Sequence, residues 1–389
     1  MKKYAKDRVA ILLRDRDRLP ALLRPAHRLA TGVPRPGARP KGGTPLRHFA
    51  KDVGLMGLGM AAAAVGVHLA AAALPLSVVG IPLTFIGMLG ATGRARRIVV
   101  GHVHEASHGV AATYYSKRGM SRRRARRIAE AILDFGTAIT LTTNGQEYRR
   151  DHGHHHDPRR LGTLADPDGA LLKSWSLWPD EAEKVVRRLL LLAFSPRWHA
   201  RFFAERLASN LLRGRPSRRL LGAAALALMA GSAFVLSFPV WLAAVFLPLG
   251  PGYQIATLLQ LATIHPYGFA TPADTLEAHA ERTWTRIPYA PMPEEGSGVA
   301  AWGRWAIRAL GHAMARLAVL DDTMVAHDYH HLAWPIGEPF EDWWNTAIYW
   351  VDSYVAGRLP EGAESRVLWG LPQALQRQQE QFDKLRARP

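Results

Sequence analysis

Apolar and charged positions alternate along this chain in long blocks. No Asp, Glu, Lys or Arg occurs in residues 53–93 or in residues 220–273. One helix needs about 20 apolar residues to cross the hydrocarbon core of a bilayer, so each block has room for two crossings. A break lies near the middle of each block, at Leu74-Pro75-Leu76 and at Phe238-Pro239, and proline ends or bends a helix. The pattern therefore predicts two transmembrane hairpins, with about four spans.

Basic residues flank both hairpins and indicate their orientation. Arg47 and Lys51 precede the first hairpin, and Arg213 and Arg215 are among the arginines that precede the second. Lys and Arg at span ends favour the cytoplasmic side. We therefore expect an all-α integral membrane protein of a bacterial inner (cytoplasmic) membrane, with a helical cap and both termini in the cytoplasm.

The chain divides into three expected segments around these spans. Residues 1–50 form a basic N-terminal segment with an amphipathic stretch that is typical of an interfacial helix. Residues 51–355 form the membrane domain, and residues 356–389 form a polar C-terminal helix or tail. Residues 135–146 are apolar but too short to span, so we expect them to lie in the membrane interface or to re-enter.

Composition changes this picture in three ways. The formal net charge of +18 suits anionic lipid head groups, and since no RNA- or DNA-binding motif accompanies it, we expect no nucleic-acid partner. A basic run lies between the hairpins and is either a solvated loop or a docking surface for an acidic protein. Its docking candidates are Arg122, Arg123, Arg124, Arg126 and Arg127. The chain has no Cys, which excludes disulfides and a cysteine-ligated iron–sulfur cluster.

Histidines are concentrated in the stretches "HVHEASH", "HGHHHD" and "HDYHH". Within each stretch, spacings of three and four residues place imidazoles on one face of a helix. The histidines that share these faces are His104, His108, His152, His155, His156, His327, His330 and His331. One tetrahedral zinc needs only three or four ligands, so this set predicts two metal ions. His102 and His154 fall off the shared faces, and we expect them beside the site or at the surface.

Two other functions use part of this pattern. His104-Glu105-Ala106-Ser107-His108 fits the H-E-x-x-H motif of zinc metalloproteases, but a zinc hydrolase leaves the other two clusters without a role. A metal transporter or sensor is the non-enzymatic alternative; transporters place polar ligands inside their spans, and the predicted spans contain only His68. The predicted topology instead puts all three clusters on the cytoplasmic side, as a single site requires.

The three clusters, in this order around two hairpins, resemble the H-x-x-x-H, H-x-x-H-H and H-x-x-H-H boxes of the membrane fatty acid desaturases and related hydroxylases. The resemblance covers roughly residues 50–350 and implies a cytoplasmic centre of two non-haem irons that uses O2 as co-substrate. It implies that the eight histidines are ligands and adds His265 of "LATIHPYG", because the family often has a ligand after the fourth span. His279 and His312 stay open as other sources of an extra ligand.

Acidic residues accompany each cluster. A metal-bound imidazole usually donates its second N–H to a carboxylate or carbonyl, which fixes the orientation of the ring. We expect this supporting role, with solvent exposure as the alternative, for Glu105, Asp151, Asp157 and Asp328.

The resemblance implies a desaturase that acts on an acyl chain linked to lipid, coenzyme A or carrier protein. Hydroxylation of a lipid or specialised metabolite is the alternative, because both reactions begin by removing hydrogen from carbon. Desaturation needs electrons from outside the substrate, and this chain has neither cluster cysteines nor a G-x-G-x-x-G dinucleotide loop. We therefore expect a separate donor such as ferredoxin with its reductase.

Overall fold

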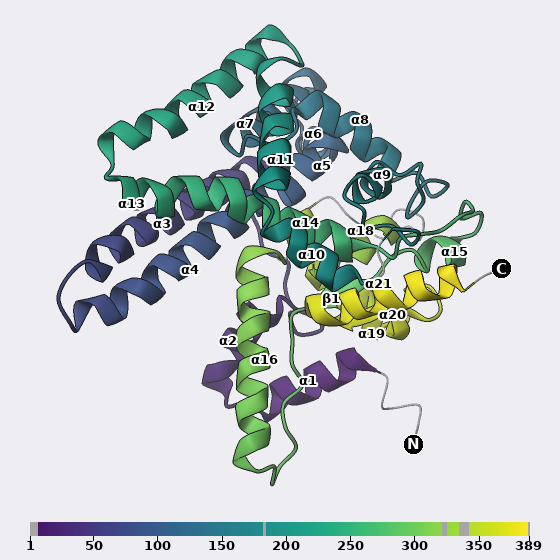
Figure 1. Ribbon diagram of the computed structural model, residues 1–389. Helices are drawn as coiled ribbons and strands as arrows, with labels where there is room; N and C mark the ends of the chain where they lie inside the picture. The colour runs from purple at the N-terminus through teal and green to yellow at the C-terminus, as the bar shows by residue number, and fades with distance from the viewer. Residues whose placement is uncertain (1–6, 182–183, 321–324, 334–341, 388–389) are drawn as a thin grey trace. The chain divides into compact units, whose positions relative to one another are not determined.

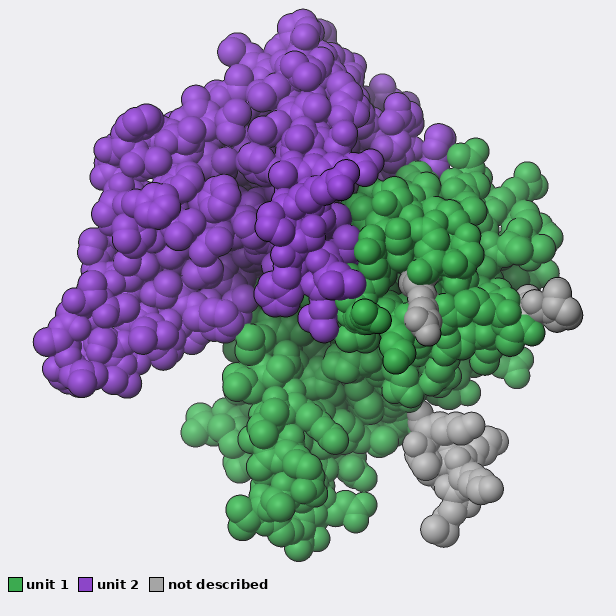
Figure 2. Space-filling model, in the orientation of Figure 1, with its two compact units in different colours: residues 1–41, 155–188, 259–389 green, residues 42–154, 189–258 purple. Residues whose placement is uncertain are grey.

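The computed structural model describes residues 7–181, 184–320, 325–333 and 342–387. This part of the chain is mainly helical and contains one short parallel sheet, in which β1 (Thr285–Ile287) pairs with β2 (Val367–Trp369) (Figure 1). The predicted all-α class is confirmed. The chain forms two compact units (Figure 2): unit 1 comprises residues 1–41, 155–188 and 259–389, and unit 2 comprises residues 42–154 and 189–258.

Four helical stretches of the described chain are long and apolar enough to cross a membrane: Pro45–Ala70, Leu76–Ser107, Pro216–Val235 and Phe238–Ile264. The first and third are α3 (Pro45–Ala70) and α12 (Pro216–Val235). The second joins α4 (Leu76–Arg97), the π-helix η3 (Ile98–Val103) and α5 (His104–Ser107). The fourth joins α13 (Phe238–Trp241), η4 (Leu242–Phe246), η5 (Pro248–Gly252) and α14 (Tyr253–Ile264). The four predicted spans are therefore confirmed.

Glycines bring α3 and α4 into close contact. A Cβ added at Gly87 would lie 2.4 Å from the backbone nitrogen of Ala63, and one added at Gly66 would lie 2.4 Å from that of Thr84. Small residues let helix backbones approach within a membrane, where packing replaces the hydrophobic effect as the source of stability. The close packing of α3 against α4 in the first hairpin therefore requires glycine at these positions.

Replacing Gly87 with Leu should destabilise unit 2. The new side chain has to push α3 away, and overpacking of this kind costs about 1–3 kcal/mol. Thermal unfolding in detergent measures the effect. Gly57→Leu on α3 is the matched control, because nothing lies within 4 Å of a Cβ added there; an equal loss of stability in both variants would contradict this packing.

A buried carboxylate ties α3 to the last turn of α4 and to the π-helix. Asp52 accepts hydrogen bonds from Arg94 Nη1 (3.0 Å), Arg97 Nε (2.7 Å) and His102 Nε2 (2.8 Å). Single π-helical turns are rare in proteins, but those that occur often lie at functional sites. Here the turn directly precedes His104, so the contacts of Asp52 fix the chain that presents the first histidine cluster.

Between the second and third spans, unit 2 contains α6 (Val110–Lys117), α7 (Arg122–Ile139), α8 (Gly145–His155) up to residue 154, α10 (Val185–Ala193) from residue 189, and α11 (Pro196–Leu211). Residues 135–146 form the end of α7 and the turn into α8. Buried Arg206 of α11 donates to the carbonyls of Thr140 (2.7 Å) and Leu141 (2.9 Å) in this turn. The placement of this segment at a membrane interface stays a prediction.

Unit 1 contains shorter helices around the sheet. They are α1 (Arg8–Arg18), η2 (Ala21–Leu23), α2 (Arg24–Thr31), α9 (Pro167–Ser174), α15 (Leu276–Ala280), α16 (Val299–Ala318), α18 (His327–Leu332), η6 (Trp343–Asn345), α19 (Thr346–Val355), α20 (Ala363–Arg366) and α21 (Gly370–Arg386). The amphipathic N-terminal stretch forms α1, which buries Val9 and Leu12. Its Asp15 accepts a hydrogen bond from Tyr289 (2.7 Å) beside β1. Helix α21 lies within the C-terminal segment of residues 356–389.

Candidate metal centre

Unit 1 gathers four buried histidines from three elements. His155 ends α8, His265 follows α14, and His327 and His331 lie one turn apart on α18. One ring nitrogen of each lies within 4.8 Å of the corresponding atoms of the other three. The Nε2 atoms of His155 and His265 are 3.2 Å apart, and those of His327 and His331 are 3.1 Å apart. These residues are named the four-histidine group below.

The hydrogen bonds of this group leave nitrogen lone pairs facing one another. His155 Nδ1 donates to Asp166 Oδ1 (2.9 Å), and His265 Nδ1 donates to the carbonyl oxygen of Arg282 (2.9 Å). A neutral imidazole carries one N–H, so each of these rings then presents an unprotonated Nε2 to the other. Two lone pairs buried 3.2 Å apart repel each other unless a proton or a metal cation lies between them. The donor set therefore fits a metal that binds imidazole.

Burial also favours the neutral form that binds metals. The pKa values of His265, His327 and His331 lie well below the usual range, first because burial disfavours the charged ring and then because neighbouring imidazoles repel it. His155 differs. Burial lowers its pKa, but the charges of Asp166 and Asp168 outweigh that effect and raise it to about 9. Asp166 thus holds the Nδ1 proton, and a bound metal would take the place of a proton on Nε2.

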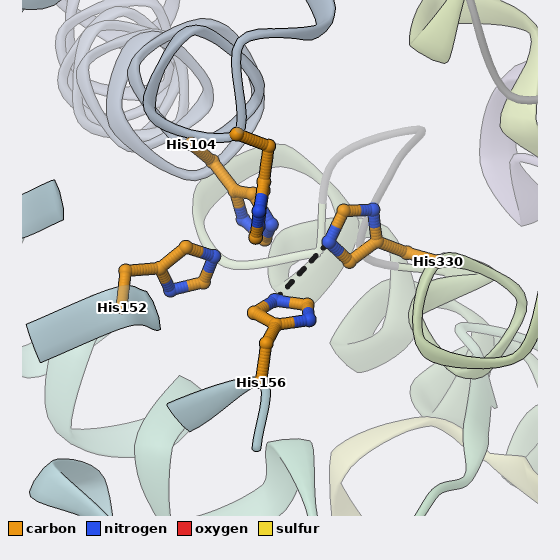
Figure 3. Close-up of side chains that lie close together, drawn as sticks. His104, His152, His156 and His330 are labelled. Carbon is orange, nitrogen blue, oxygen red and sulfur yellow. Dashed lines mark hydrogen bonds between the residues drawn. The ribbon is translucent and has the colours of Figure 1, made fainter. Parts of the chain in front are cut away.

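Unit 2 gathers three histidines of the first two clusters. His104 begins α5, His108 caps its C-terminal end, and His152 lies on α8. The ring centroids are 4.1 Å apart for His104 and His152, 4.7 Å for His108 and His152, and 5.2 Å for His104 and His108. Tyr148, one helical turn before His152, stacks on its ring. Figure 3 labels His104 and His152 of this set.

A further pair of histidines borders the four-histidine group in unit 1. His156 directly follows α8 and His330 lies on α18, with their Nε2 atoms 3.2 Å apart (Figure 3, dashed line). The ring of His156 also stacks on His331 at a centroid distance of 4.2 Å. Each of the nine histidines predicted as ligands therefore lies in one of three sets: the four-histidine group, the three histidines of unit 2, or the pair formed by His156 and His330.

The other histidines singled out in the sequence lie elsewhere. His102 is buried against Asp52 (2.8 Å), and His154 is exposed. His279 is buried with its ring centroid 6.1 Å from that of His331, and half-buried His312 lies against Gly370. Neither His279 nor His312 belongs to a ligand group in the described part of the chain.

The acidic residues expected to support the ligands have varied partners. Asp328 is buried and accepts from Thr285 and from Trp350 Nε1 (3.2 Å), and Glu105 is buried in α5. Asp151 pairs with Arg150 (2.8 Å) and Asp157 pairs with Arg160 (3.3 Å).

Sequence reasoning missed two carboxylates that contact His155 of the four-histidine group, those of Asp166 and of Asp168, whose Oδ2 lies 3.6 Å from His155 Nδ1. Fully buried Asp166 accepts from His155 Nδ1, from the backbone N–H of Gly162 (3.0 Å) and from that of Asp168 (2.9 Å). The sequence alone marks Asp166 as the start of a helix, because Asp followed by Pro at position 167 is typical of a helix N-terminus. Its contact with His155 comes from the chain folding back over eleven residues.

The predicted docking arginines lie on the first turns of α7. Arg122, Arg123, Arg124, Arg126 and Arg127 are all exposed, while Ala125 and Ala129 face the interior of unit 2. The helix begins at Ser121, whose hydroxyl accepts from the backbone N–H of Arg124. This surface of unit 2 is therefore strongly basic.

The model of the fatty acid desaturase family matches residues 78–293, which is more than half of the chain. The matched stretch includes the first two histidine clusters and His265, and the third cluster follows it. A search of curated proteins found no match.

Proposed function

The chain belongs to the fatty acid desaturase family, and from this premise we propose that it is a membrane oxidoreductase that uses O2 to insert a double bond into a fatty acyl chain. The observation that supports this most strongly is the four-histidine group. Four buried imidazoles place ring nitrogens close together, a donor set that suits a bound cation, and none of them brings a negative charge. A site of this kind leaves a bound metal strongly Lewis acidic.

We propose that nine histidines hold two irons, with the four-histidine group as one site. The remaining predicted ligands are His104, His108 and His152 in unit 2 and His156 and His330 in unit 1. Helix α8 carries His152 and ends at His155. Bound iron supplies O2 activation and the oxidising power to remove hydrogen from an unactivated carbon. The chain supplies neutral nitrogen ligands, and Asp166 orients one of them.

Elemental analysis of protein purified with iron available should give two irons per chain. The expectation follows from a donor set that is too large for a single tetrahedral ion. One tightly bound zinc per chain, with turnover restored by zinc alone, would instead support a hydrolase at His104 and His108.

We propose that the substrate is an acyl chain attached to lipid, coenzyme A or carrier protein. Each CH2 group that leaves water contributes about 0.8 kcal/mol, so a site beside membrane spans suits such a chain. The basic span flanks support a cytoplasmic site. Mass spectrometry of acyl chains from cells with and without the gene tests the reaction: a lost double bond supports desaturation, a lost hydroxyl group shows a hydroxylase, and an unchanged profile contradicts both.

Desaturation takes two hydrogens from the substrate and combines them with O2, two electrons and two protons to give two waters. We propose that the electrons come from an acidic carrier, such as ferredoxin with its reductase, that docks at the exposed arginines of α7. Opposite charge mainly raises the encounter rate, and salt screens it over a Debye length of about 8 Å at physiological ionic strength.

Arg123→Glu together with Arg127→Glu should slow ferredoxin-driven turnover at low salt and leave the iron content unchanged. These residues lie one turn apart on the exposed side of α7. The matched control is Arg197→Glu with Arg201→Glu, an exposed pair of the same spacing and charge on α11 of the same unit. Equal slowing by both pairs would show a general charge effect, and no slowing by the α7 pair would place the donor elsewhere.

A further inference from the structure

Helix α16 of unit 1 turns its most apolar side outward. Val299 is 90% exposed, Ile307 is 74% exposed and Leu310 is 64% exposed. Trp302 and Met314 are exposed on the same side. With 3.6 residues per turn these positions form one continuous face along the helix. Such a face on a soluble surface marks an interaction site.

The opposite side of α16 holds the contacts with the rest of unit 1. Trp305 Nε1 donates to the carbonyl of Ala290 (3.1 Å), and Arg316 Nε donates to that of Leu29 on α2 (3.3 Å). His312, between them on this side, lies against Gly370. The inward side therefore carries polar groups and the outward side carries large apolar ones, which reverses the usual arrangement for a helix on a soluble protein.

The borders of the apolar face are basic. Arg304 and Arg308 are exposed along one edge of α16, and the helix contains no acidic residue. Helix α2 packs beside α16 (Figure 1) and adds exposed Leu29 and Arg28, again without an acidic residue. Exposed apolar side chains with Trp and a basic edge are the features of a helix that lies in a membrane interface.

We propose that the apolar face of α16 binds the interface of a bilayer that contains anionic lipids, and so attaches unit 1 to the membrane separately from the spans. Two observations favour lipid over a second copy of the chain. The four apolar helices already bring the protein to a bilayer. Two copies meeting through this face would also bring like-charged arginines together, whereas anionic head groups complement them. The family match ends before α16, and the proposal does not depend on the reaction.

The lack of Cys permits a direct test on the full chain in lipid nanodiscs. Gly303 lies four residues from both Val299 and Ile307, and nothing lies within 4 Å of a Cβ added there, so Gly303→Cys can carry a nitroxide spin label without a clash. Arg308→Cys, on the basic edge, is the matched control. Electron paramagnetic resonance compares collisions of each label with O2, which concentrates in the bilayer, and with a water-soluble nickel complex.

The label at position 303 should lie ~5–10 Å into the head-group and acyl boundary and collide mainly with O2, while the label at position 308 should collide mainly with nickel. Replacing anionic by zwitterionic lipid should raise the nickel collisions at position 303. Equal nickel collisions at both positions would overturn the proposal. So would protection from both reagents together with spin–spin broadening, which would show a second copy of the chain. The measurement reads label position alone, so it can succeed or fail independently of the proposed desaturation.

Discussion

His331→Ala should abolish turnover and remove one of two irons. His331 is 4% exposed, and its Nε2 lies 3.1 Å from that of His327 within the four-histidine group. Alanine removes one nitrogen ligand and provides no other donor atom in its place. Iron content and turnover are measured on the same preparation, since loss of the metal and loss of the reaction should coincide.

His154→Ala is the matched control for this change. His154 lies between two predicted ligands in sequence, yet it is exposed, so we expect normal iron content and turnover. His331→Asn adds a test in which most of the polar volume is kept, and circular dichroism shows whether each variant is folded. A folded His331→Ala protein with two irons and full turnover would exclude this residue as a ligand.

The membrane spans and most of the candidate site were predictable because their signals are local. A helix in hydrocarbon cannot hold unpaired charges, so the absence of Asp, Glu, Lys and Arg outlined the hairpins directly. The three clusters follow helical spacing, and α5, α8 and α18 carry most of their histidines. His108 and His156 differ slightly, because α5 ends at Ser107 and α8 ends at His155.

Contacts between distant parts of the sequence were not predictable in this way. His265 stands alone in its stretch, and only the family resemblance drew attention to it. The bond from His102 to Asp52 joins residues fifty positions apart, and no spacing rule connects them. His102 lies in the π-helix before His104, so this contact joins that helix to α3. The reversed polarity of α16 was likewise hidden, because a helical pattern shows which residues share a face and leaves open which face is outward.

Asp166 is the clearest example of a residue that only the fold reveals, and Asp166→Asn should weaken iron binding or turnover by about 10–100-fold, as loss of a carboxylate behind a ligating imidazole generally does. With its oxygen at the Oδ1 position, asparagine still accepts from the Asp168 N–H that begins α9 and from His155 Nδ1–H, but the negative charge behind His155 is lost. Its amide N–H2 then opposes the Gly162 N–H, which bonds the other carboxylate oxygen.

The matched control for this change is Asp157→Asn, which removes a carboxylate that pairs with Arg160 on the surface (3.3 Å). Iron titration of each metal-free protein gives the affinity, and thermal unfolding of the same samples separates a lost ligand orientation from a general loss of stability. Asp166→Asn should lower iron affinity and leave α9 folded, because its cap survives. If the two variants bound iron equally well, His155 would not need the carboxylate, and Asp166 would serve only to begin α9.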